Sequence, residues 1–237
     1  MAKKAGATTL THGEKMAGTV FFVLYLLILP LITKPLLALL GRLLGVSISS
    51  GLGNTIYYYL LFAVTLVIFH HFIGRTTSLL IDGLGRAFRT LGAGAVAFYG
   101  LNELMYRVTR LLTDNHTNLN DMTISAQMDS APRTTILIVI FLAPFVEEVL
   151  FRGLVFGGIR GRSRAGAYLI SCALFAFLHV WQFALVNQDA TYFLLMLQYL
   201  VPGLVFCWVF EHSGTLWTAI FLHAGINALS VLSMLGR

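Results

Sequence analysis

The sequence predicts an all-α membrane protein, a polytopic bundle of about seven transmembrane helices. Hydrophobic residues make up 57% of the 237 residues and charged residues only 11%, whereas soluble domains contain about 45–50% apolar and about 25% charged residues. The mean hydropathy is +0.81. Windows of about 20 mostly apolar residues, the length that crosses a bilayer as a helix, recur along the chain. These observations exclude a disordered chain, a coiled coil and an ordinary cytosolic domain.

The N-terminal region, residues 1–133, is expected to contain three spans and a polar loop outside the bilayer. The first span, Met16–Thr33, is too long for a typical signal-peptide core, and no small-residue cleavage site follows it, so we expect an uncleaved anchor. Leu36–Leu44 extends this span or lies at the membrane interface; as a separate crossing it would raise the count to eight. The remaining elements are the spans Asn54–Phe72 and Thr90–Tyr106 and the Asn-, Asp-, Thr- and Ser-rich loop Leu111–Arg133.

The C-terminal region, residues 134–237, is expected to form a core of four further helices. The first of these windows contains two glutamates and one arginine, and the other three contain no charged residue. The expected helices are Thr134–Ile159, Ala165–Val186, Thr191–Phe210 and Thr215–Leu235.

The basic residues orient the chain and exclude a nucleic-acid partner. The formal net charge is +6, but the sixteen Lys and Arg residues are spread along the chain without a basic stripe or a nucleic-acid motif. With the N-terminus in the cytoplasm, nine of them lie in inner segments and six in outer segments. Cytoplasmic loops are enriched in Lys and Arg, and the cluster Arg160, Arg162 and Arg164 is the strongest inner signal. We therefore predict a multi-pass integral membrane protein with a cytoplasmic N-terminus.

Three of the C-terminal helices place ionisable side chains at one depth in the membrane. At about 1.5 Å per residue, Glu147, His179 and His223 lie roughly 20, 22 and 16 Å from the inner ends of their helices. Charged and polar side chains within the hydrocarbon are costly and usually mark functional sites. This common layer is the most informative feature of the sequence.

The spacing of the neighbouring polar residues is consistent with one catalytic centre. Glu148 and Arg152 are four residues apart and can pair on one helix face, as can His223 and Asn227. Phe175 is four residues before His179 and can shield or position that imidazole. A carboxylate and an imidazole can hold and deprotonate a water, while a second histidine and an amide can stabilise an oxyanion. No Ser or Cys with an evident triad partner lies in this layer, so the pattern favours water activation without a covalent intermediate.

The polar residues form three motifs that together resemble those of a known family. Glu147–Arg152 is an EExxxR motif, Phe175–His179 an FxxxH motif and His223–Asn227 an HxxxN motif. In this order and spacing they resemble the CPBP family, the CAAX-processing and bacteriocin-processing intramembrane proteases, also called the Abi family of glutamic proteases. The resemblance covers about Thr134–Arg237, and the N-terminal region shows only generic spans.

The resemblance implies an intramembrane glutamic endopeptidase without a metal cofactor. Glu147 and His179 would then activate the water, and His223 and Asn227 would form the oxyanion site. Glu148 and Arg152 would support this geometry. Family members process prenylated CAAX termini or take part in bacteriocin maturation, immunity and surface display, so the implied partner is a membrane-associated peptide in the lipid bilayer.

Two other functions are compatible with the same residues. A zinc-dependent membrane metalloprotease could use Glu147, His179 and His223 as ligands and leave one open position, although HExxH is absent and Asn227 is a poor zinc ligand. A transporter or a non-enzymatic scaffold could use the polar layer as an ion or partner site. Transporters often have broken helices in corresponding halves, and the two halves of this sequence do not correspond.

Overall fold

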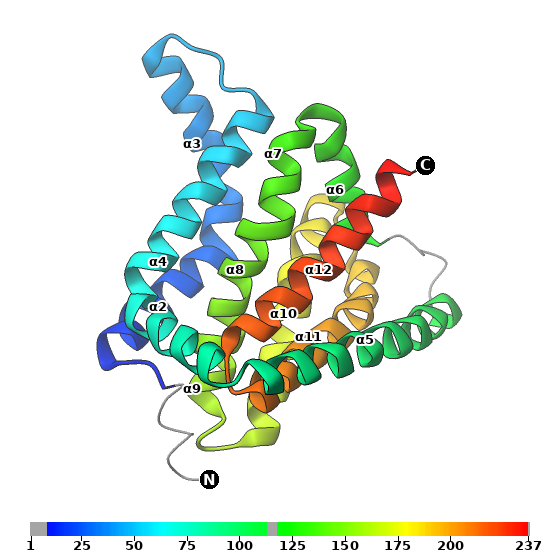
Figure 1. Ribbon diagram of the computed structural model, residues 1–237. Helices are drawn as coiled ribbons and strands as arrows, with labels where there is room; N and C mark the ends of the chain where they lie inside the picture. The colour runs from blue at the N-terminus through cyan, green and yellow to red at the C-terminus, as the bar shows by residue number, and fades with distance from the viewer. Residues whose placement is uncertain (1–8, 113–117, 237) are drawn as a thin grey trace.

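The protein is a bundle of helices, several of them long enough to cross a membrane (Figure 1). The computed structural model describes residues 9–112 and 118–236, and every regular element in these two stretches is a helix. This confirms the polytopic all-α fold. Within the described residues, six helical stretches are long and apolar enough to span a bilayer: His12–Leu44, Ser50–Asp82, Pro132–Ile159, Arg164–Asn187, Ala190–Ser213 and Leu216–Leu235.

The first span is one long helical stretch made of α2 (His12–Val23), the π-helical segment η2 (Leu24–Ile28) and α3 (Leu29–Leu44). It starts at Thr11, whose hydroxyl caps the first turn, and ends before Gly45, whose φ of 67° few other residues adopt. Leu36–Leu44 therefore extends the first span, and a separate crossing by this segment, which would have given eight spans, is wrong.

A buried carboxylate fastens the first span to α4 (Ser50–Asp82). The helix α4 has non-helical φ and ψ angles at Phe69, which interrupts its backbone hydrogen bonding. Glu14, only 4% exposed, accepts the N–H of Phe72 at 2.6 Å and that of Thr11 at 2.7 Å. The same carboxylate lies 3.4 Å from the guanidinium of Arg75. One side chain thus satisfies backbone donors on two helices.

The helix α5 (Leu84–Leu112) contains the third expected span, Thr90–Tyr106, but it is not among the six apolar candidates. Polar residues along its length, including Asn102, Glu103 and Arg107, lower its hydropathy. In Figure 1, α5 runs crosswise to α4 and passes in front of α11. Its inner face contacts α11 and α12, and Gly94 permits this approach. The sequence therefore predicted the helix correctly but overestimated the number of clearly apolar spans.

The expected polar loop Leu111–Arg133 contains a helix, α6 (Leu119–Ser130), so the loop prediction was wrong for that part. The side chain of Asn118 accepts the N–H of Asp121 and caps the helix. Leu119 and Ile124 are 2% and 3% exposed, which shows that α6 packs against the bundle. The anchoring apolar residues are few and separated by polar ones, so the local composition suggested a loop. Residues 113–117 of this segment lie outside the described part of the chain.

The helix that contains the EExxxR motif is the central helix of the bundle. It consists of α7 (Pro132–Leu137), η3 (Ile138–Leu142), α8 (Ala143–Glu148), η4 (Val149–Phe156) and α9 (Gly157–Ile159), of which η3 and η4 are π-helical. In its most apolar window 67% of the residues are buried, compared with 22% for α4. π-helical turns within α-helices often occur at functional sites.

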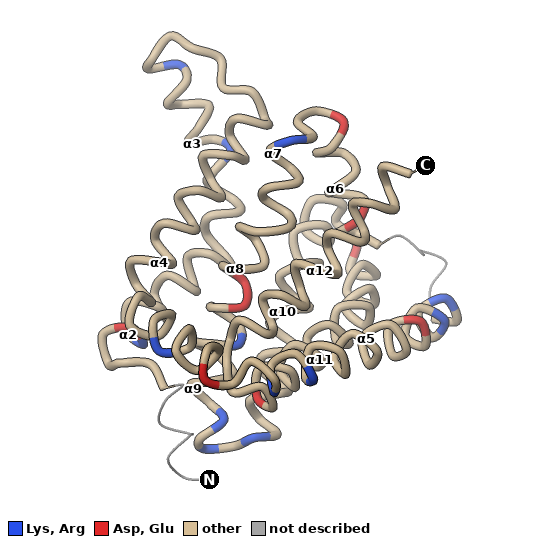
Figure 2. The backbone as a smooth tube through the Cα atoms, viewed as in Figure 1, with Lys and Arg blue, Asp and Glu red and all other residues tan. Residues whose placement is uncertain are grey.

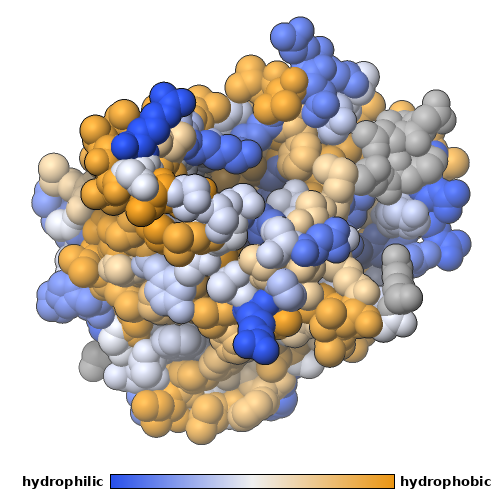
Figure 3. Space-filling model, turned by 90° about the horizontal axis from the view of Figure 1, so that it is seen from above, coloured by the Kyte–Doolittle hydropathy of each residue, from blue (hydrophilic) through white to orange (hydrophobic). Residues whose placement is uncertain are grey.

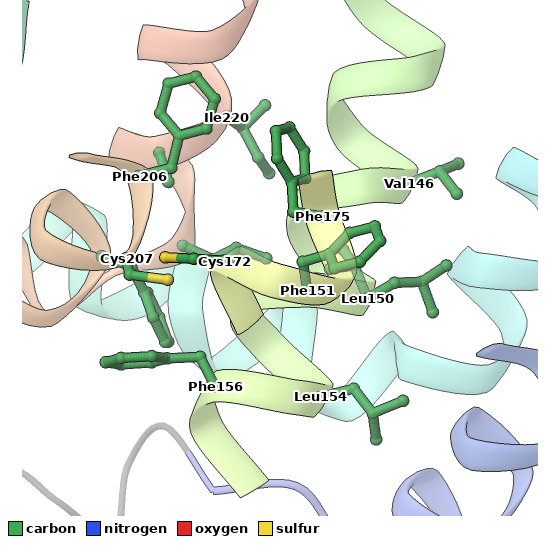
Figure 4. Close-up of a cluster of buried hydrophobic side chains, with 14 of the residues drawn as sticks. Val146, Leu150, Phe151, Leu154, Phe156, Cys172, Phe175, Phe206, Cys207 and Ile220 are labelled. Carbon is green, nitrogen blue, oxygen red and sulfur yellow. The ribbon is translucent and has the colours of Figure 1, made fainter. Parts of the chain in front are cut away.

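Three C-terminal helical stretches surround this central helix and supply the rest of the core. They are α10 (Arg164–Asn187), the 3₁₀ segment η5 (Ala190–Leu195) followed by α11 (Met196–Ser213), and α12 (Leu216–Leu235). Figure 4 shows the aromatic and aliphatic side chains that meet between them, among them Phe151, Phe175 and Phe206. Cys172 and Cys207 are buried in this core as free cysteines.

The outer surface is largely apolar, as a lipid-facing surface should be. Figure 3 shows apolar side chains over much of the molecule's periphery. Several large apolar side chains on the spans are more than two-thirds exposed, including Val67 (74%), Leu169 (72%) and Val186 (80%). Soluble monomers rarely expose large contiguous apolar patches, and here exposed apolar side chains recur along helices that are long enough to span a bilayer. The bilayer is therefore the medium that this surface fits.

Close packing of α5 on α11 can be tested at Gly94. A Cβ there would lie 2.4 Å from Val209 Cγ2 and 3.0 Å from Leu222 Cδ2. Gly94→Ala should therefore lower the free energy of unfolding by about 1–3 kcal/mol, the usual cost of overpacking. Gly92→Ala is the matched control, because a Cβ there meets nothing within 4 Å. Thermal unfolding of the purified protein, followed by tryptophan fluorescence, measures both, and equal melting temperatures would contradict the packing described.

Candidate active site

A buried carboxylate at the end of α8 joins two of the three motifs. Glu148 is fully buried, and its Oε1 accepts a hydrogen bond from Arg152 Nη1 at 2.9 Å. The same oxygen lies 2.8 Å from Nδ1 of His223 on α12. An ionised carboxylate only accepts hydrogen bonds, so this contact places a proton on Nδ1. The expected pairing of Glu148 with Arg152 is confirmed, and Glu148 also orients His223.

Arg152 is enclosed by aromatic rings in the middle of the bundle. Its side chain is fully buried in the π-helical segment η4, and its Nη2 donates to the carbonyl oxygen of Gly203 at 3.3 Å. The guanidinium carbon lies 4.3 Å from the ring centre of Phe175 and 5.0 Å from that of Phe206. Desolvated cation–π contacts of this kind stabilise a buried cation.

Each of the two histidines is stacked on an aromatic ring. The ring centres of His223 and Phe206 are 4.7 Å apart with an interplanar angle of 21°, and those of His179 and Tyr199 are 4.5 Å apart at 22°. Nδ1 of His179 lies 2.9 Å from the carbonyl oxygen of Phe175. A carbonyl oxygen only accepts hydrogen bonds, so the proton is on Nδ1. The lone pair on Nε2 of neutral His179 can then accept a hydrogen bond from another group.

Glu147 lies beside His223. Its Oε2 is 4.0 Å from His223 Nε2, and this oxygen is buried without a hydrogen-bond partner in the described part of the chain. Among the hydrogen bonds of the described residues, none joins Glu147 directly to His179. The expected arrangement, with one water between these two side chains, stays a prediction. An unpaired buried carboxylate oxygen is unusual and suggests a group that is paired only when water or substrate is present.

Asn227 is the last of the four expected catalytic residues, and its amide has a partner on the central helix. Nδ2 donates to the carbonyl oxygen of Val139, in the π-helical segment η3, at 2.9 Å. An amide nitrogen has two N–H groups, so one remains for another acceptor. The bond holds α12 against the central helix and fixes the direction of the second N–H.

One cavity of about 350 Å³ connects these groups to the outside of the bundle. His179, His223 and Asn227 line it, together with Phe175, Phe206 and Tyr199. Polar residues of α5, α6, α11 and α12 line its other half. Three of the four expected catalytic residues therefore share one cavity. Glu147 is not among its lining residues, but its Oε2 lies 4.0 Å from Nε2 of His223, which is one of them.

Three contributors to this site lay outside the sequence prediction: Tyr199, Phe206 and the segment α6. Tyr199 is 5% exposed, and its hydroxyl accepts the backbone N–H of Asn120 on α6 at 3.0 Å. Because the ring of Tyr199 stacks on His179, this hydrogen bond connects α6 to the support of that histidine. Aromatic residues are common throughout this apolar sequence, so neither Tyr199 nor Phe206 could be distinguished from core residues before the helices were placed.

A catalytic zinc ion requires about three ligating side chains close together. Within residues 9–112 and 118–236, no group of three or more His, Cys, Asp or Glu side chains lies close enough together to hold a metal ion. Nδ1 of His223 is occupied by Glu148 and Nδ1 of His179 by the Phe175 carbonyl. The three ligands considered from the sequence, Glu147, His179 and His223, do not form a zinc-binding group in this geometry.

The comparisons with known proteins agree with the three motifs. Residues 129–229 match the family model described as Type II CAAX prenyl endopeptidase Rce1-like. The matched region includes the EExxxR, FxxxH and HxxxN motifs, and the match confirms the resemblance that they indicated. No curated protein and no solved structure matches the chain.

The two adjacent glutamates should differ in their effect on stability. Within the described residues, Glu148→Gln removes the only carboxylate hydrogen-bonded to the fully buried Arg152, and breaking a buried ion pair typically costs about 3–5 kcal/mol. Glu147→Gln, the same change one residue earlier, should lower the free energy of unfolding far less, because Oε2 of Glu147 has no hydrogen-bond partner among the described residues. Thermal unfolding of the two purified variants compares them, and equal losses would show that Glu148 is not the structural member of the pair.

Proposed function

We propose that this chain, whose residues 129–229 match the family model described as Type II CAAX prenyl endopeptidase Rce1-like, is a glutamic endopeptidase that hydrolyses a peptide bond of a membrane-associated substrate. The family is one of membrane peptidases, and six candidate spans make this an integral membrane protein. The observation that carries the proposal is the meeting of His179, His223 and Asn227 at one cavity, with a partnerless Glu147 oxygen 4.0 Å from His223.

The first chemical step is attack by water. Glu147 takes a proton from a water that the Nε2 lone pair of His179 also holds, and the water oxygen forms a bond to the carbonyl carbon of the substrate. The carbonyl π electrons move to its oxygen and give a tetrahedral oxyanion. The proton on Glu147 then passes to the leaving nitrogen as the C–N bond breaks. A general base within reach of the water is what this step requires.

The oxyanion is stabilised by donors on α12. Nε2 of His223 donates one hydrogen bond when it carries a proton, and the contact of Nδ1 with Glu148 holds the ring in position for this bond. The second N–H of Asn227 is the other donor, with its direction fixed by the bond to Val139. Donors that are already oriented cost little reorganisation during the reaction. In this mechanism Arg152 does not contact the substrate; its hydrogen bond holds the Glu148 carboxylate in place.

The proposed base can be tested directly at Glu147. Glu147→Gln keeps the side-chain volume and removes the base, so it should abolish cleavage of a fluorogenic prenylated CAAX peptide by the reconstituted protein. Its melting temperature should stay near that of the wild type. Proteomics of membrane peptides in cells with and without an active Glu147 extends the test to native substrates. Wild-type rates in the variant would place the base elsewhere, on Glu148, and absence of cleavage by the wild type would favour a scaffold or transporter.

Asn227 separates the glutamic mechanism from a zinc mechanism. Asn227→Ala should lower kcat by about 10²–10³-fold, the typical cost of one oxyanion donor, with little change in KM. Asn227→Asp should be at least as damaging, because it places a negative charge beside the developing oxyanion. We also propose that no metal cofactor is required, so wild-type activity should survive a strong chelator. An Asp variant more active than the Ala variant, with stoichiometric zinc, would contradict the glutamic mechanism.

We further propose that the N-terminus and the Arg160–Arg164 connection face the cytoplasm. Figure 2 shows Lys and Arg gathered at the end of the bundle near α9, where the described chain begins. The helix α6 and the C-terminal part of α12, which carry polar lining residues of the cavity, then lie toward the opposite side of the membrane. Membrane-impermeant labelling should modify Ser125→Cys on α6 from outside and Gly161→Cys only after permeabilisation. The reverse pattern would invert the orientation.

A further inference from the structure

The half of the cavity away from the catalytic histidines has the composition of a peptide-binding surface. It is formed by four elements, α5, α6, α11 and α12, so it exists only in the folded bundle. Amide and hydroxyl side chains predominate there, with exposed or half-buried positions at the mouth. Its polar lining residues are Asn102, Asn118, Asn120, Asp121, Gln198, Ser230 and Ser233.

Gln198 has an unused hydrogen-bond donor at this surface. The residue is 8% exposed and lines the cavity from α11, next to Tyr199, which supports His179. Its Nε2 is buried and has no hydrogen-bond partner among the residues that the structure describes. Buried amide donors without a partner are rare in native proteins, because leaving them unpaired is costly. A peptide carbonyl in the cavity is the complementary acceptor.

Asp121 gives the same surface a negative charge. No Lys or Arg is among the described residues that line the cavity, and Asp121 is the one carboxylate among them. It is held in place from two directions: the hydroxyl of Ser230 donates to its Oδ1 at 2.8 Å, and its backbone N–H donates to Asn118 at 3.1 Å. An acidic group on a ligand would meet this carboxylate without a neutralising cation.

We propose that this polar half of the cavity is a substrate subsite in which Gln198 binds a backbone carbonyl and Asp121 selects a basic or neutral residue over an acidic one. The inference rests on the proposed peptidase function, because it assigns the occupant as the peptide segment beside the scissile bond. Backbone recognition by an amide requires no particular side chain, so the charge of Asp121 supplies the discrimination. The substrate class is therefore a peptide with an uncharged or basic segment next to the cleavage position.

Binding and cleavage must be measured separately, because the inference and the proposed function could fail independently. The probe is a fluorescent prenylated CAAX peptide, made with Lys, Gln or Glu at each of the three positions on either side of the prenylated cysteine. Binding is measured on Glu147→Gln protein in liposomes, and cleavage on the protein with Glu147 intact. At one position or more, Glu should weaken binding at least about threefold relative to Lys, the scale of a solvent-accessible ion pair.

Two substitutions and one control locate the effect. Asp121→Asn should remove the difference between Lys and Glu peptides, whereas Asp129→Asn, the same change at an exposed site of α6 outside the cavity lining, should not. Gln198→Met, which keeps the length of the side chain and removes the amide, should weaken all peptides alike.

The outcomes distinguish the two proposals. Equal binding of Lys and Glu peptides, or selectivity that persists in Asp121→Asn, overturns the role of Asp121 even if cleavage is normal. Unchanged binding to Gln198→Met overturns the role of Gln198. Selective binding without any cleavage by the protein with Glu147 intact would leave the subsite in place and contradict the peptidase function.

Discussion

The structure depends on one carboxylate, Glu148, which is fully buried and shared between a cation and a histidine. A buried charge is very unfavourable unless it is paired and hydrogen-bonded. Arg152 supplies the opposite charge from the next helical turn, and His223 supplies a donor from α12. The guanidinium is in turn covered by Phe175 and Phe206. The arrangement therefore requires the central helix, α10, α11 and α12 to be in place together, which couples the catalytic geometry to the folding of the bundle.

This pairing leaves the neighbouring Glu147 free for chemistry. Two adjacent glutamates on one helix point in different directions, about 100° apart. Glu148 contacts Arg152 and His223 through its Oε1, whereas no hydrogen bond among the described residues involves the Glu147 carboxylate. The same division extends to the histidines, whose Nδ1 atoms contact a carboxylate and a carbonyl and whose Nε2 atoms remain available. The site thus separates supporting contacts from reactive atoms.

The outer elements determine what can reach this centre. The crosswise helix α5 and the short helix α6 supply walls of the cavity. Tyr199 connects α6 to His179, because its hydroxyl accepts a backbone N–H of α6 and its ring stacks on the imidazole. At the opposite end of the bundle, Glu14 fastens the first span to α4 at the break near Phe69. Both contacts join residues that are far apart in the chain, and neither has a local sequence signal.

The sequence by itself determined the membrane bundle, the positions of its apolar helices and the chemistry of the motif residues. This was possible because bilayer-spanning length and the i,i+4 spacing of Glu148 with Arg152 are local properties of one helix. Tertiary structure decided that Glu148 binds His223, that Asn227 bonds to Val139, and that a polar segment forms α6 and closes a cavity with Gln198 and Asp121. Equal depth in the membrane brought Glu147, His179 and His223 to one layer, but depth leaves each helix free to rotate. Only packing between helices fixed which atoms meet.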